Sequence, residues 1–257
     1  MSRCQVVPFC LMALLTSPLA CSAQLNSHRD PRGVPTSNPS SAITSVHELQ
    51  VPKKARDACN NGTRRLAAKD LAGSISEFQK AIKAFPGYYE AYAKLGAAEL
   101  DLDQWDAAES AFRKAIELSE GRYPPANFGL GLILATVTKQ FVEAEGIVRS
   151  GLTLSPTDVT GHFVLAWVLY STGRLKEAEE NARETILLAP GFGRAKLLLA
   201  QIHLGENRFS AVIADLDSYL ALGRTSSLDD QVRSIRAEAL EALPKEQTDS
   251  EIAEATK

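Results

Sequence analysis

The side chains that could do chemistry in this 257-residue sequence are few and widely separated. Three of the four cysteines lie within the first 21 residues, so Cys59 has no disulfide partner in the rest of the chain. A catalytic thiol needs a base beside it, and residues 55–88 contain no histidine. We therefore expect Cys59 to be a small packing residue.

The four histidines do not form a site in the sequence either. His28 and His47 lie in or near a stretch rich in Pro and Ser, without further ligands at metal-binding spacing. His162 and His203 fall on separate helical segments and are interpreted as helix-face residues. The sequence contains no glycine-rich phosphate loop, no paired metal ligands and no nucleophile elbow. It predicts a protein that is not an enzyme and that requires no cofactor and no metal.

The charge of the chain argues against two further classes of partner. The formal net charge is −3, and no run of lysines or arginines occurs. Nucleic acids and anionic membrane surfaces attract basic patches, so we expect neither to be the main partner.

One group of apolar side chains could act in binding instead. Phe163, Trp167 and Tyr170 are spaced i, i+4 and i+7, which places them in one ridge on a helix. Residues 128–137 and 162–170 are hydrophobic nearly all round, which is typical of helices covered on both sides. Two interpretations stay open: the three aromatic residues pack in the core, or they anchor an apolar peptide or helix of a partner.

The helical elements are clearest over residues 91–118. Leu95, Gly96 and Leu100 follow helical spacing, and a second apolar face follows after a short turn. Small residues such as Gly96 and Ala108 allow two helices to approach within roughly 8–10 Å. A single helix pair of this size cannot bury its apolar faces, so it needs neighbours of the same kind.

Those neighbours are visible as a repeat. Gly96, Phe112 and Ala115 recur 34 residues earlier as Gly62, Phe78 and Ala81. A 34-residue period with helix–turn–helix content is typical of tetratricopeptide repeats, and the chain resembles this family over about two-thirds of its length. In this register the expected repeats begin at Ala55, Tyr89, Pro125, Val159 and Gly193.

The resemblance implies an all-α fold, a right-handed α-solenoid of about five helix–turn–helix units. It also implies that the first helices line a concave groove that binds a protein or peptide. The family's groove positions fall here on a set of mostly apolar residues: Ile133, Val137, Phe163, Trp167, Tyr170, Arg194 and Gln201. The lysine and asparagine clamp that some relatives use for a C-terminal carboxylate is absent, with Cys59 and Thr63 at its first two positions.

The N-terminus is typical of a secretory signal peptide, here residues 1–23. Arg3 precedes an apolar run over residues 6–15 and then Pro18 and small residues. Cleavage after Ala23 gives simple secretion. Alternatively, residues 19–21 resemble a bacterial lipobox whose Cys21 would be lipidated, although Pro18 stands where a branched aliphatic residue is usual. The run is too short for a membrane span, which needs about 20 apolar residues.

The remaining chain divides by composition. We expect a disordered linker over residues 24–50, the solenoid over 51–224, a capping helix over 225–243 and a flexible tail over 244–257. The capping helix is expected to bury one face, made of Leu228, Val232, Ile235 and Leu240.

Together these features predict an exported bacterial tetratricopeptide repeat protein, periplasmic or secreted, that binds partner proteins without catalysis. The alternative is a lipoprotein anchored to a membrane through Cys21 that serves envelope or outer-membrane assembly.

Overall fold

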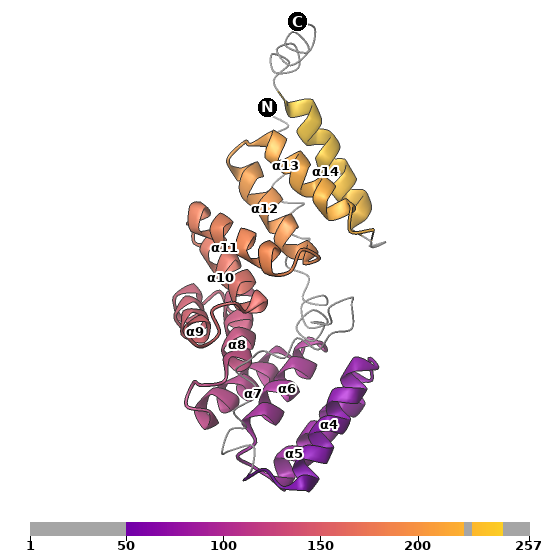
Figure 1. Cartoon of the computed structure of the whole chain (residues 1–257), viewed down its shortest axis with the longest axis vertical. Coiled ribbons are helices and arrows are strands. Elements are labelled where there is room, and N and C mark those ends of the chain that lie inside the picture. The colour runs from indigo at the N-terminus through magenta and orange to yellow at the C-terminus, as the bar shows by residue number, and fades with distance from the viewer. Residues whose placement is uncertain (1–49, 224–227, 244–257) are drawn as a thin grey trace, which may run out of the picture. The chain divides into compact units, whose positions relative to one another are not determined.

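The computed structural model describes residues 50–223 and 228–243. This part of the chain contains eleven α-helices and no strand (Figure 1). The expected signal peptide, the tail and all but one residue of the expected linker lie outside the described residues.

Ten of the helices form five consecutive pairs, as the 34-residue period predicts. The first helices of the pairs are α4 Lys53–Ala67, α6 Tyr89–Leu100, α8 Pro124–Thr136, α10 Val159–Ser171 and α12 Gly193–Gly205. The second helices are α5 Leu71–Ala84, α7 Trp105–Leu118, α9 Phe141–Leu154, α11 Leu175–Leu188 and α13 Phe209–Leu220, followed by α14 Asp229–Ala242. The expected all-α solenoid of about five units is confirmed, and three of the five expected starts agree to the residue.

The chain forms two compact units. Among the described residues, one contains residues 50–164 and the other residues 165–223 and 228–243, so the division falls inside α10. The two units are described separately below.

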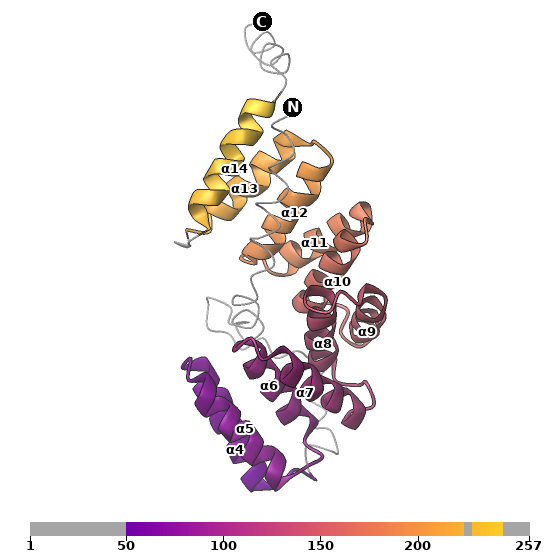
Figure 2. The same ribbon diagram turned by 180° about the vertical axis from the view of Figure 1, so that it is seen from behind.

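In the first unit, each helix from α4 to α9 packs on the next along the chain (Figures 1 and 2). Phe78, Phe112 and Phe128 are fully buried between helices. Each ring fits because glycines face it: a Cβ on Gly62 would lie 2.6 Å from the ring of Phe78, and one on Gly129 only 2.4 Å from that of Phe112. The glycines therefore set how closely these helices approach.

The turn inside each pair has the same backbone conformation. Lys69, Asp103, Lys139, Gly173 and Asn207 all have a positive φ, between 56° and 78°. Successive members are 34 residues apart except for Asp103 and Lys139, which are 36 apart because the second junction is two residues longer. This recurrence fixes the register of all five helix pairs.

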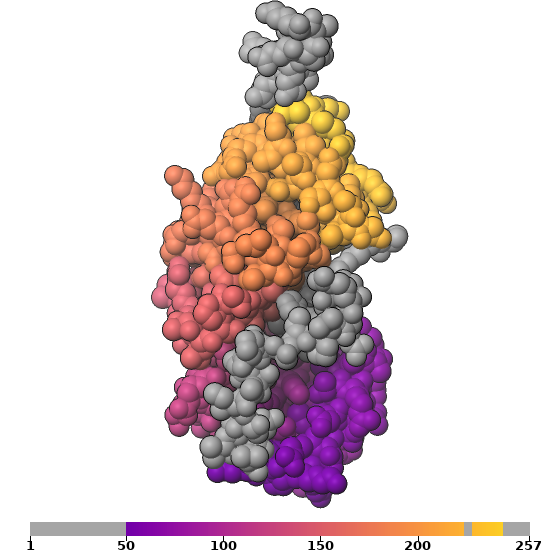
Figure 3. Space-filling model, in the orientation of Figure 1, coloured from indigo at the N-terminus to yellow at the C-terminus, as the bar shows by residue number. Residues whose placement is uncertain are grey.

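In the second unit, α11 packs on α12, α12 on α13, and α13 on α14. Figure 3 shows the yellow surface of α14 directly against the orange surface of the preceding helices. Val232, Ile235 and Ala239 are buried on α14. The prediction that Leu240 lies on this buried face is wrong, because Leu240 is 45% exposed. Each residue turns the helix by 100°, so Ala239, four residues after Ile235, lies on the buried face and Leu240 does not.

Adding one methyl group at Gly62 tests the close approach of α4 and α5. Gly62→Ala is expected to lower the free energy of unfolding by about 1–3 kcal/mol, because the fully buried ring of Phe78 cannot move aside. Gly146→Ala in α9 is the matched control. Its Cβ would meet nothing within 4 Å, so it should stabilise the helix by up to about 1 kcal/mol. Equal effects of both substitutions in urea unfolding would contradict this packing.

Candidate protein-binding surface

The seven residues that the sequence assigns to a groove are divided between the two units. Ile133, Val137 and Phe163 belong to the first unit, and the other four belong to the second. In the first unit, Ile133 and Phe163 are buried, with 1% and 2% of their surface exposed. Val137, just after α8, is 40% exposed and is the member of this group available to a partner.

The first repeat contributes a polar contact at the two positions of the missing clamp. Cys59 is fully buried, as a packing residue should be. The Nζ atom of Lys94 lies 3.7 Å from its Sγ atom and 3.2 Å from the Oγ1 atom of Thr63. Lys94 thus bridges the first two repeats where the clamp residues would stand.

In the second unit, Trp167 and Tyr170 lie together on α10. Their ring centroids are 6.0 Å apart, at an interplanar angle of 39°. Trp167 is only 4% exposed, whereas Tyr170 is partly exposed. The burial favours packing for the indole ring, while Tyr170 presents an accessible edge.

Gln201 on α12 is the most unusual polar residue of this surface. It is 3% exposed, yet neither its Oε1 nor its Nε2 atom has a hydrogen-bond partner in the described structure. The indole Nε1 of Trp167 is buried without a partner in the same way. The great majority of buried polar groups in proteins have a hydrogen-bond partner, so these unpartnered atoms are unusual.

Gln201 also lies next to Tyr170. Burial raises the pKa of the Tyr170 phenol, and the Gln201 amide lowers it in part. The two groups lie close together but do not meet the geometry of a hydrogen bond. Arg194, seven residues before Gln201, lies on the same face of α12 and is partly exposed.

His203, which the sequence places on a helix face, lies on α12 and is buried. It is 2% exposed, and its ring nitrogens lie 2.7 Å from Asp215 Oδ2 and 3.2 Å from Glu179 Oε1. The hydrogen bond with Asp215 raises the pKa of His203, burial opposes this, and Glu179 adds to the rise. Partial burial raises the pKa of Glu179, but hydrogen bonds with Arg183, Arg208 and His203 lower it to about 2. The network ties α11, α12 and α13 together.

This network predicts a pH dependence of stability. Because the pKa of His203 is raised above 6.5 in the folded chain, its stabilising contribution is complete below pH 6.5 and is lost as the pH rises through the folded-state pKa. His203→Gln is expected to cost about 1–3 kcal/mol at pH 6 and less at pH 9. Thermal unfolding of both proteins between pH 6 and pH 9 measures this difference in stability. An equal cost at both pH values would show that the histidine is not charged in the fold.

No helix within the described ranges is long and apolar enough to cross a membrane.

The family assignment follows from a comparison of the sequence with family models. The model for the tetratricopeptide repeat matches residues 59–127, 96–159 and 163–227, which together make up more than half of the chain. The chain belongs to the tetratricopeptide repeat (TPR) family. Proteins of this family are generally non-catalytic scaffolds that bind protein or peptide partners. No curated protein matches the sequence.

Solved structures with a similar fold include PilW, PilF and YrrB. PilW, described as a widely conserved type IV pilus biogenesis factor, is 16% identical, with a TM-score of 0.65 over 74% of this chain and 91% of PilW. PilF of Pseudomonas aeruginosa is 17% identical, with a TM-score of 0.60 over 73% of this chain and 89% of PilF. YrrB, described as a TPR protein with an unusual peptide-binding site, is 18% identical, with a TM-score of 0.52 over 79% of this chain and 96% of YrrB. At these identities the likeness concerns the fold.

Proposed function

We propose that this TPR protein is an exported, non-catalytic scaffold that binds an extended peptide segment of a partner protein. The binding surface of the second unit consists of Trp167, Tyr170, Arg194 and Gln201. In the first unit the proposal includes Ile133, Val137 and Phe163, of which Val137 provides the exposed contact.

The observation that carries the proposal is the unpaired amide of Gln201. A primary amide both donates and accepts, so it can form two hydrogen bonds with the N–H and C=O groups of one extended residue of a bound backbone. The partly exposed Tyr170 beside it supplies an aromatic contact for an apolar side chain of the ligand. Both features suit an extended peptide, whose backbone groups are not paired with each other.

A second candidate function is that of a lipid-anchored assembly factor of the envelope. It is favoured by Cys21 after Leu19 and Ala20, which resembles a lipobox. The likeness in fold to PilW, a pilus biogenesis factor, fits the same role.

The remaining organisation is proposed from composition. Residues 1–23 act as a signal peptide, residues 24–50 and 244–257 as a linker and a tail, and residues 51–224 as the solenoid. Residues 225–243, which include α14, cover the open end of the last repeat, because a terminal repeat must hide its apolar face from water.

Photo-crosslinking in cells tests the binding function. Tyr170→p-benzoylphenylalanine should give a covalent adduct with a distinct partner, because this side chain lies on the proposed surface and is partly exposed. Leu187→p-benzoylphenylalanine on α11 is the control, since Leu187 is 73% exposed but belongs to a second helix. Adducts of the same size and yield from both positions, or none from Tyr170, would contradict the proposal.

Export is tested by the mature N-terminus. A fusion of residues 1–45 to a reporter that is active only outside the cytoplasm should give a signal. Mass spectrometry of the mature chain should then find Gln24 as the first residue. A diacylated Cys21 would instead support the envelope-anchored alternative, and an intact Met1 would contradict export altogether.

A further inference from the structure

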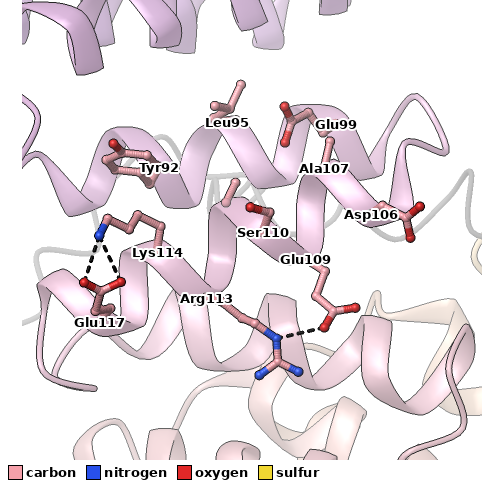
Figure 4. Close-up of a pocket in the computed structure, with 11 residues that line it drawn as sticks. Tyr92, Leu95, Glu99, Asp106, Ala107, Glu109, Ser110, Arg113, Lys114 and Glu117 are labelled. Carbon is pink, nitrogen blue, oxygen red and sulfur yellow. Dashed lines mark hydrogen bonds and ion pairs between the residues drawn. The ribbon is translucent and has the colours of Figure 1, made fainter.

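A pocket of about 890 Å³ lies between the two helices of the second repeat, inside the first unit. Figure 4 shows side chains of α6 and α7 around it. Leu95, Ala107 and Ala111 form apolar walls, and Tyr92 lies at one end. The pocket is separate from the surface proposed above, so the following inference does not rest on that function.

The pocket contains a residue that departs from the family's pattern. TPR sequences follow the order Trp-x2-Leu-Gly-x2-Tyr along the first helix. Here this order is Tyr92-x2-Leu95-Gly96-x2-Glu99, so a carboxylate stands where the pattern has a tyrosine ring. A short acidic side chain cannot fill the space of that ring.

Glu99 is buried and unsatisfied. It is 8% exposed, and its Oε2 atom has no hydrogen-bond partner in the described structure. Burial raises its pKa to about 7. A carboxylate in this position is strongly stabilised by a cation that reaches it, since the cation offsets the loss of hydration.

The other charges of the pocket are mostly paired. Lys114 donates to both oxygens of Glu117, at 2.8 and 2.9 Å. Arg113 donates to Glu109 at 2.8 Å and to Glu143 outside the pocket at 2.9 Å. Asp106, at the start of α7, has no ion-pair partner among the described residues. In Figure 4, Glu99 and Asp106 lie toward one end of the pocket and the Lys114–Glu117 pair toward the other.

We propose that this pocket binds a lysine or arginine side chain of a partner peptide. The cationic head group pairs with Glu99, with the charge of Asp106 toward the same end of the pocket, and the aliphatic stem lies along Leu95 and Ala107. Basic side chains bury their stems on apolar surface in this way and keep the charge on a polar partner. The two cations that line the pocket do not supply this charge, because Arg113 and Lys114 are already paired with Glu109 and Glu117.

Two other occupants fit less well. A metal ion needs three or more ligands, and no group of three His, Cys, Asp or Glu residues suited to a metal occurs within the described ranges. A free diamine would leave most of the 890 Å³ empty. Pockets of about 300–1,000 Å³ are the size class that encloses a ligand larger than one side chain. The volume therefore favours a basic residue with its peptide neighbours.

The test uses the full chain labelled with ¹⁵N and the acetylated pentapeptide Ala-Leu-Lys-Leu-Ala as probe. The peptide should shift the amide signals of α6 and α7. The same peptide with an acetylated lysine keeps the stem but loses the charge, and it should not shift them. 1,5-Diaminopentane should bind at least about tenfold more weakly than the peptide, because it lacks the flanking contacts.

Two variants that each remove one negative charge separate a specific site from general attraction. Glu99→Gln should weaken peptide binding at least about tenfold, and Glu117→Gln should change it less than about twofold, because Glu117 is already paired. Circular dichroism checks that both variants fold. Asp106→Asn tests the second carboxylate of the pocket. Because Asp106 is exposed, this variant should weaken peptide binding by only about threefold.

The proposal is overturned if Glu99→Gln binds the peptide as the parent does, or if both Gln variants lose binding equally. If the acetyl-lysine peptide binds as tightly as the lysine peptide, the amide shifts come from apolar contacts and the proposed charge pairing is wrong. Equal affinity for diaminopentane would make the pocket a site for free small cations instead.

Discussion

Replacing Trp167 with alanine is expected to lower the free energy of unfolding by about 3–5 kcal/mol, the usual cost of truncating a buried aromatic side chain. The indole ring is 4% exposed and contacts the ring of Tyr170. Urea unfolding followed by circular dichroism measures the loss.

Trp167→Phe is the control, because it keeps an aromatic ring and removes the Nε1–H group that has no partner. It should cost far less than the alanine variant. If Trp167→Ala unfolds like the parent, the ring is not packed in the core, and the aromatic ridge is an open anchor for a partner.

Replacing Glu99 with glutamine is expected to stabilise the chain above neutral pH. The folded-state pKa of Glu99 is raised from 4.5 to about 7 by burial. The carboxyl group therefore contributes stability that is present below pH 4.5 and is lost as the pH rises through about 7. One pKa unit corresponds to about 1.4 kcal/mol, so Glu99→Gln should exceed the parent by up to about 3 kcal/mol at pH 8.

The pH dependence makes this result specific to Glu99. Below pH 4.5 the parent and the variant should have the same stability, because both side chains are neutral there. Glu109→Gln is the matched control. Glu109 pairs with Arg113 near the surface, so its loss should change stability by no more than about 1 kcal/mol. A Glu99→Gln variant that is less stable than the parent at pH 8 would show that the carboxylate has a partner in the fold.

The sequence predicts the helices of this protein well because its repeats share one period. The starts expected at Tyr89, Val159 and Gly193 agree with the structure, since small and aromatic residues recur at fixed helix positions. The recurring positive φ inside each pair is not visible in the sequence. Lys69 and Lys139 adopt it without being glycine, because the packing of two helices forces the turn.

The candidate site is less predictable because burial depends on neighbours distant in sequence. Periodicity places Trp167 and Tyr170 on one face, but only the fold shows that the first is covered and the second partly open. Glu99 and His203 both occupy the repeat position where the family's pattern has tyrosine. The sequence shows that a glutamate and a histidine replace the tyrosine, but it does not show their contacts. That His203 finds two carboxylates and Glu99 finds no partner is a property of the packed helices.

The most direct test of the proposed binding function is the Gln201→Leu variant of the chain that carries the crosslinker at position 170. Leucine is similar in size and removes a buried amide that has no partner, so the unfolding midpoint should stay the same or rise. The adduct with the partner should fall at least about tenfold, because two hydrogen bonds with the peptide backbone are lost. An adduct of unchanged yield in a folded Gln201→Leu chain would contradict peptide binding at this surface.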